Sequence, residues 1–235
     1  MNKTLPTFRY LMKSITTAMM IEVVVILGNV AVTDLVFFLT NKYSLTNEDL
    51  SLTVPFEFVT GNFALLLGMV LFISDFKVVL ANGVSRKTYW LATLLSAGTA
   101  AAAFSMFNLL VMIVHGLFWP IVFITELFYP QIGWAGLFIF QFILYFLLIM
   151  LGRLVALAYY RSSTPVRWAI SLAPFVVLGA LAVVNARLGG TVFGAIQAFQ
   201  LASMRMDRAP WTLLAYAGIL GGLVYLLLRR APVRD

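Results

Sequence analysis

The sequence contains no cysteine and a single histidine, His115. The lack of cysteine excludes disulfides, thiolate catalysis and cysteine-based metal sites. One imidazole cannot form a metal centre without help from carboxylates, and none lies close to His115 in the sequence. We therefore expect no metal site and no cofactor on this chain.

Charged residues are also scarce, because they make up only 11% of the 235 residues, whereas 62% are hydrophobic and the mean hydropathy is +0.98. Ordinary soluble domains carry about 25% charged residues. The chain has several runs of about 20 mostly apolar residues, the length that a helix needs to cross a bilayer. These runs are too long for the strands of a membrane barrel. The sequence therefore predicts an all-α polytopic membrane protein in which residues 1–235 form a single transmembrane domain.

The apolar runs predict six membrane spans, which place both termini on the same side. They lie at about 20–40, 56–74, 89–118, 133–159, 166–184 and 211–228. Of the 16 lysines and arginines, about twelve fall on the side of the termini, which the positive-inside rule assigns to the cytosol. The net charge of +7 thus reports topology and not a nucleic-acid partner. We expect a multi-pass protein of a bacterial plasma membrane.

The first 18 residues have the pattern of an amphipathic helix. Apolar residues at helical spacing form one stripe, and basic residues lie on the opposite side. Such a helix can lie in the membrane interface. A cleavable leader is the alternative, but the apolar run that follows is too long for one. The predicted interfacial residues are Phe8, Arg9, Leu11, Met12, Lys13 and Ile15.

Residues 75–90 form the first strongly polar break between two long apolar runs. Asn82 and Gly83 tolerate a positive φ and predict the end of a helix. Ser85 is suited to cap the next helix, and Arg86 and Lys87 follow it. This pattern indicates a short, basic, tightly bent connection, although the two cations alone could equally be a membrane anchor.

Residues 82–89, Asn-Gly-Val-Ser-Arg-Lys-Thr-Tyr, resemble the cytosolic loop between the second and third spans of bacterial ABC-2 type permeases. The resemblance implies that this loop is a coupling helix that docks on a separate ATP-binding subunit. It also implies a homodimer, or a heterodimer with a second permease, and places ATP and Mg²⁺ on the partner subunit. The coupling residues that it implies are Lys77, Asn82, Gly83, Val84, Ser85, Arg86 and Lys87.

The chain has no Gly-x-x-x-x-Gly-Lys-[Ser/Thr] phosphate loop, so ATP hydrolysis would belong to another polypeptide. Residues 185–210 are too polar and too short to span, and are expected to form an external re-entrant or interfacial segment before the last span. We therefore expect the permease subunit of an ATP-driven exporter. The apolar, aromatic-rich bundle favours a lipophilic or amphipathic substrate such as a hydrophobic peptide, drug or lipid.

Several polar residues fall inside the predicted spans, where they are costly and face protein or a water-filled path. They are either interhelical contacts or part of a substrate pathway. Two other classes of function remain open, an intramembrane enzyme and a passive channel or membrane anchor. An enzyme would need ionisable groups that converge, whereas Glu22, Glu57 and Glu126 are expected at different depths. The candidate pathway residues are Glu22, Asp34, Asn62, Gln141 and Arg153.

Overall fold

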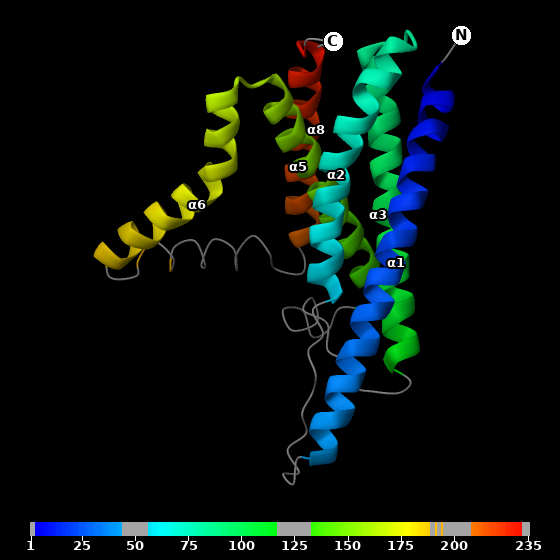
Figure 1. Cartoon of the computed structure of the whole chain (residues 1–235), viewed down its shortest axis with the longest axis vertical. Helices are drawn as coiled ribbons and strands as arrows, with labels where there is room; N and C mark the ends of the chain where they lie inside the picture. The colour runs from blue at the N-terminus through cyan, green and yellow to red at the C-terminus, as the bar shows by residue number, and fades with distance from the viewer. Residues whose placement is uncertain are drawn as a thin grey trace.

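The computed structural model describes residues 3–43, 56–116, 133–188 and 208–231, with Thr191 and Gly194 in addition. Within these ranges the side chains of parts of α1 and α6 are outside the description, as is that of His115. The described residues form helices and no strand (Figure 1). The helices are α1 (Thr4–Tyr43), α2 (Phe56–Ala81), α3 (Arg86–Gly116), α5 (Trp134–Arg161), α6 (Thr164–Arg187) and α8 (Ala209–Arg229).

Five stretches of helix are long and apolar enough to cross a membrane, which confirms the prediction of an all-α, multi-pass membrane protein. They are Thr4–Gly28, Glu57–Ala81, Arg86–Val114, Trp134–Arg161 and Ala209–Arg229. The predicted fifth span corresponds to α6, a helix of 24 residues that is not among these five, and a sixth span stays a prediction. The predicted segment 185–210 falls mostly outside the described residues, while its ends belong to α6 and α8.

Helix α5 lies at the centre of the bundle, where it packs against α2, α8 and α3, and α1 covers α3 and α2. Helix α6 bends away from this bundle (Figure 1) and packs mainly against α5.

The crossing of α2 and α5 depends on two glycines, one from each helix. A Cβ on Gly68 would lie 2.2 Å from the backbone oxygen of Ile149, and a Cβ on Gly152 would lie 2.1 Å from that of Leu65. No side chain fits at these distances, so the two backbones touch directly. Small residues permit such close approach in membrane helices.

Helix α1 is continuous from Thr4 to Tyr43, so the predicted interfacial helix over 1–18 is the first part of a longer helix and not a separate element. Pro6 lies in the first turn, where it removes no hydrogen bond of the helix, and no helix breaker follows before Gly28. The predicted apolar stripe exists, but it packs against protein: Leu11 and Ile15 are 0% exposed and belong to the hydrophobic core.

The other residues of the predicted interfacial helix are also divided between a buried apolar side and an exposed basic side. Phe8 and Met12 are partly buried against the core, whereas Arg9 and Lys13 are exposed. The amphipathic pattern was therefore predicted correctly. The prediction that its apolar face lies in the membrane interface was wrong, because this face packs against protein. Periodicity identifies a buried face but carries no information on whether protein or lipid covers it.

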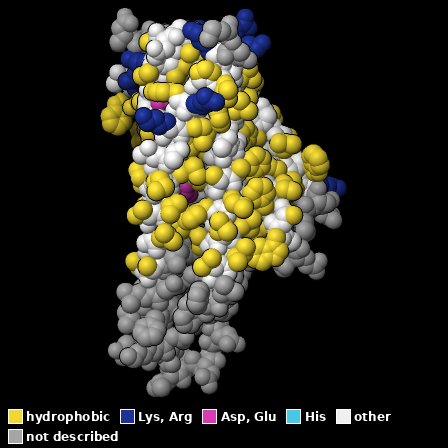
Figure 2. Space-filling model, turned by 90° about the vertical axis from the view of Figure 1, so that its right-hand side faces the viewer, with side chains coloured by type: hydrophobic (Ala, Val, Ile, Leu, Met, Phe, Trp, Pro, Cys, Tyr) yellow, Lys and Arg dark blue, Asp and Glu magenta, His cyan; other side chains and the backbone are white. Residues whose placement is uncertain are grey.

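Both termini lie at the same end of the bundle as the connections α2–α3 and α5–α6 (Figure 1). Lysine and arginine side chains gather at this end, while the described surface farther along is largely hydrophobic (Figure 2). We call it the basic end. Below it, the ring of Phe76 packs against Phe72, Tyr89 and Tyr160, at centroid distances of 4.9, 5.6 and 5.6 Å. These rings join α2, α3 and α5 under the basic end.

Candidate functional site: a basic turn and two buried polar clusters

The connection between α2 and α3 is a four-residue turn, 82–85, and not a longer loop over 75–90. Gly83 has a φ of +69°, and its N–H donates to Leu80 O while that of Val84 donates to Val79 O. These two bonds form a Schellman motif, the standard glycine-dependent end of a helix. Ser85 then caps α3, because its Oγ accepts from Thr88 N at 3.1 Å. The predicted stop and cap are both confirmed, and together they fix the shape of the turn.

The N-terminus and α8 are tied to this basic turn, which we define as Asn82–Ser85 with Arg86 and Lys87. Lys3 Nζ donates to Gly83 O at 3.2 Å. Arg86 Nη1 donates to Arg229 O at 2.6 Å. Arg161 donates to Leu227 O at 3.0 Å, so two arginines satisfy carbonyls at the end of α8, where a helix carries partial negative charge. The turn is thus linked to α1 and α8 as well as to α2 and α3.

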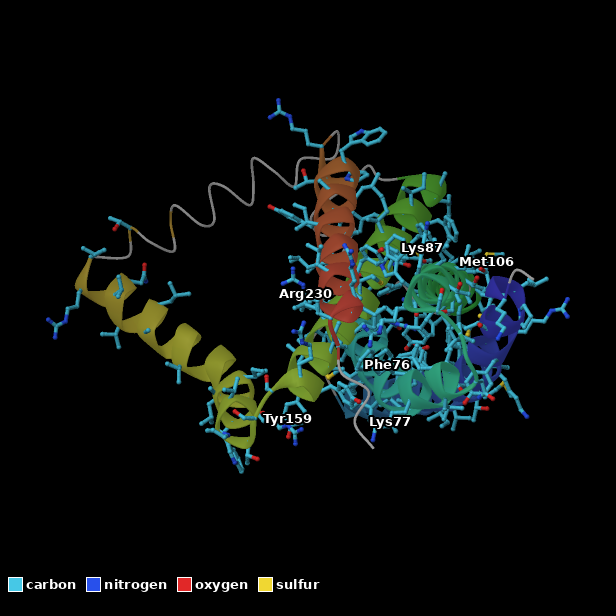
Figure 3. All side chains as sticks on the ribbon, turned by 90° about the horizontal axis from the view of Figure 1, so that it is seen from above. Phe76, Lys77, Lys87, Met106, Tyr159 and Arg230 are labelled. Carbon is cyan, nitrogen blue, oxygen red and sulfur yellow. The ribbon has the colours of Figure 1, made fainter. Side chains whose placement is uncertain are left out.

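The cations of the basic turn and the nearby Lys77 of α2 have different surroundings. Arg86 is half-buried and engaged with α8, whereas Lys87 and Lys77 are exposed. Figure 3 looks down on the basic end and places Lys77, Lys87 and Arg230 on α2, α3 and the end of α8. The two exposed lysines are therefore available to a partner, while the Arg86 guanidinium serves an internal contact that the sequence did not predict.

A groove of about 220 Å³ lies beside the basic turn, between the start of α1 and the end of α2. Its walls are mostly apolar, and Asn82 adds an amide whose Nδ2 donates to Val78 O at 2.7 Å. The lining residues are Pro6, Thr7, Tyr10, Val78, Val79, Asn82 and Val84.

Below the basic turn lies a first buried polar group, the ion-pair cluster, defined as Asp75, Tyr89 and Arg153. All three side chains are 1–2% exposed. Arg153 interacts electrostatically with Tyr89 and Asp75. None of its three guanidinium nitrogens has a hydrogen-bond partner among the described residues. Arg153 was a candidate pathway residue, and it is held inside the bundle near Asp75 of α2 and the Tyr89 hydroxyl of α3.

A second buried group, the acidic cluster, joins α1, α2, α3 and α5. Gln141 Nε2 donates to Glu57 Oε1 at 2.8 Å, and Thr60 Oγ1 donates to Asn108 Oδ1 at 3.1 Å. Asn108 in turn donates to the Tyr145 hydroxyl. Glu22 of α1 lies next to the Thr60 hydroxyl. The acidic cluster comprises Glu22, Glu57, Thr60, Asn108, Gln141 and Tyr145, which are all at most 7% exposed.

The acidic cluster corrects the expectation that the glutamates are scattered. Glu57 and Glu22 both act electrostatically on Tyr145, so they share one site, while Glu126 lies outside the described residues. The two clusters are about 18 Å apart along α5, from Gln141 to Arg153, at 1.5 Å per residue. The acidic cluster is therefore the one farther from the basic end.

The remaining candidate pathway residues are not part of either cluster. Asn62 is exposed, and its Nδ2 donates to Phe58 O of its own helix at 2.8 Å. This satisfies the amide locally, so Asn62 lies outside the polar interior. The side chain of Asp34 is outside the described residues. Of the five predicted pathway residues, the structure places three, Glu22, Gln141 and Arg153, in the interior.

Sequence reasoning missed Thr60, Asn108 and Tyr145. A signal was present, because Glu57 and Thr60 are three residues apart, and Gln141 and Tyr145 are four apart. Residues at these spacings lie on one face of a helix. Two polar pairs of this kind on otherwise apolar spans predict a polar contact between the helices, although not which helices meet.

The described residues hold no group of three or more His, Cys, Asp or Glu side chains placed to bind a metal ion. No protein family, no curated protein and no solved structure matches this chain.

Proposed function

We propose that the chain is the membrane-spanning subunit of an ATP-driven exporter and that a separate ATP-binding subunit docks on the basic turn. The observation that carries the proposal is the rigid basic turn itself, which is fixed by a Schellman motif and a serine cap. A connection that served only to reverse the chain would not need bonds to two further helices. The resemblance of residues 82–89 to ABC-2 permeases supports the same reading.

The contacts of the turn suggest how force would pass from the partner into the membrane domain. Lys3 joins the turn to α1, and Arg86 joins it to α8. A displacement of the turn would therefore move the ends of four helices together, as a rigid-body switch requires. In this mechanism Lys77 and Lys87 contact the partner, and Arg86 transmits the movement to α8.

The proposed substrate class is based on the apolar surface of the described helices. Many large apolar side chains of the described helices are exposed, among them Val24, Val70 and Trp211 at 69, 60 and 72%. Such surfaces face lipid, a second permease or an apolar substrate. We propose a lipophilic or amphipathic substrate, which passes between this chain and a second permease, either an identical copy or a sibling.

The docking role is tested by exchanging the exposed lysines for acids in the tagged full-length chain. Lys77→Glu with Lys87→Glu should abolish co-purification of ATPase activity from native membranes, since the partner surface would meet the wrong charge. Arg167→Glu is the matched control, because this cation at the basic end stacks on Tyr159 and lies away from the turn. It should leave the complex intact.

A second variant separates docking from transmission. Arg86→Gln removes the bond to Arg229 O and should keep the complex while reducing the coupling of ATP hydrolysis to transport. If the lysine variant retains both the ATPase and transport, the docking role is refuted. A chain that purifies only as a stable oligomer without any ATPase would favour a passive channel or anchor, and substrate turnover by the lone chain would favour an intramembrane enzyme.

A further inference from the structure

Most of the unpaired polar atoms in the described interior lie in or beside the ion-pair cluster. None of the three guanidinium nitrogens of Arg153 has a hydrogen-bond partner among the described residues. The same holds for Asp75 Oδ2, Tyr89 Oη and Thr93 Oγ1, and all four side chains are 1–2% exposed. Buried polar atoms of native proteins are almost always hydrogen-bonded, because an unpaired one is costly, and most of all when it is charged. The described protein atoms alone therefore leave this cluster incomplete.

These four side chains come from three helices and converge on one place. Arg153 of α5 interacts electrostatically with Asp75 of α2 and Tyr89 of α3. The ring of Phe76, the residue after Asp75, packs against that of Tyr89 at a centroid distance of 5.6 Å. Thr93 follows Tyr89 by four residues on the same face of α3, and the two hydroxyls lie next to each other. A bond between these hydroxyls would still leave every hydrogen of the guanidinium unpaired.

The charges of the cluster indicate what kind of ligand fits. Asp75 balances the charge of Arg153, so the site needs no further anion. The two groups attract each other but share no hydrogen bond, and Asp75 Oδ1 accepts from Ser74 Oγ of its own helix at 3.0 Å. Polar groups that attract each other without direct contact are commonly bridged by water. Water both donates and accepts, so it can serve the guanidinium, the carboxylate and the hydroxyls alike.

We propose that the ion-pair cluster is a binding site for water, in which ordered molecules bridge the Arg153 guanidinium to the polar atoms of the other three side chains. Water enters from the basic end. Asp75 lies one turn below Val79 on the same face of α2, and Val79 lines the groove beside the basic turn. Farther from the basic end, the backbone contacts of Gly68 and Gly152 close the crossing of α2 and α5. The cluster is the inner end of a hydrated pocket, and the proposal does not depend on the ATP-binding partner.

The first test uses the full-length chain in lipid nanodiscs, without any partner, and hydroxyl radicals that an X-ray pulse generates from water. These radicals modify side chains next to water, so Tyr89 should be oxidised although it is buried. Phe104 is the matched control, because its ring is also 1% exposed but lies deeper in α3, and it should stay unmodified. Arg153→Met combined with Asp75→Leu replaces the ion pair by apolar groups and should abolish the modification of Tyr89.

Thiol labelling gives a second readout, which does not need the double variant to fold. The chain has no cysteine, so a single introduced thiol is unique. Thr93→Cys should react with silver ions added in solution, because a thiol must reach water to ionise and react. Ala97→Cys is the matched control, since Ala97 lies one turn deeper in α3 and is 0% exposed within the hydrophobic core. Val78→Trp, which fills the groove from an exposed position, should slow the reaction of Thr93→Cys.

Three outcomes would overturn the water site. The first is a wild-type Tyr89 that the radicals leave unmodified, and the second is equal modification of Tyr89 in the apolar double variant. The third comes from exchanging gluconate for chloride at constant ionic strength. If chloride raises the unfolding temperature of the wild type and not of the double variant, the cluster takes an anion instead of water. An unreactive Thr93→Cys, or a reaction that Val78→Trp leaves unchanged, would overturn the entry through the groove.

Discussion

The two buried polar clusters of this bundle satisfy their charges in opposite ways. The ion-pair cluster near the basic end contains both signs of charge, Asp75 and Arg153, but the Arg153 guanidinium has no hydrogen-bond partner among the described residues. The acidic cluster is instead joined by hydrogen bonds among carboxylate, amide and hydroxyl groups, and none of its six residues is a lysine or arginine.

This difference indicates which interaction stabilises each cluster. Coulomb attraction is long-ranged and tolerates imperfect geometry, so the ion-pair cluster should depend on its net charge. Hydrogen bonds are short-ranged and directional, so the acidic cluster should depend on its count of hydrogens. Three substitutions test this distinction, from the largest expected effect to the smallest.

Arg153→Met should be the most damaging substitution, because it leaves Asp75 buried without a compensating charge. Removing one partner of a buried pair costs about 3–5 kcal/mol. We expect a much lower unfolding temperature of the detergent-solubilised chain, measured by tryptophan fluorescence. The double variant with Asp75→Asn should recover most of the loss. If it recovers none, shape and not charge maintains the ion-pair cluster.

Gly152→Ala should disturb both clusters at once, because Gly152 lies in α5 at the crossing with α2. The added Cβ would be placed 2.1 Å from Leu65 O, so the helices must separate, at a cost of about 1–3 kcal/mol. Gly218→Ala is the matched control, since a Cβ there meets nothing within 4 Å. Equal unfolding temperatures for the two variants would contradict the close crossing.

Thr60→Val should have a smaller effect that is confined to the acidic cluster. The substitution preserves shape but removes the hydroxyl that joins Asn108 and Glu22, and a hydrogen bond between membrane helices is worth about 0.6–1 kcal/mol. The loss should be visible in the same unfolding measurement. An effect as large as that of Arg153→Met would show that the two clusters do not differ in the way described here.

The local features of this fold were readable from the sequence. The pattern Asn82-Gly83 followed by Ser85 determines the end of one helix and the start of the next through φ and a side-chain cap. The apolar runs likewise predicted four of the five stretches that could span a membrane, whereas the first of the five lies at Thr4–Gly28 and not at 20–40. Each of these features depends on residues within a few positions of one another.

The contacts between distant helices could not be read in this way. The partner of Arg86 is a backbone oxygen 143 positions later, and carbonyl groups carry no sequence signature. The convergence of Glu22 and Glu57 depends on how α1 and α2 cross, which periodicity does not specify. Asn62 is the converse case, because a polar residue inside a span can satisfy its amide on its own helix.

The glycine crossing also limits how this molecule can change shape. Backbone pressed against backbone at Gly68 and Gly152 leaves no layer of side chains to rearrange, so α2 and α5 can neither slide nor rotate past each other. The two helices therefore behave as one rigid unit. A change in the shape of this bundle would have to come from helices that pack through side chains, such as α1, whose Leu11 and Ile15 lie in the hydrophobic core.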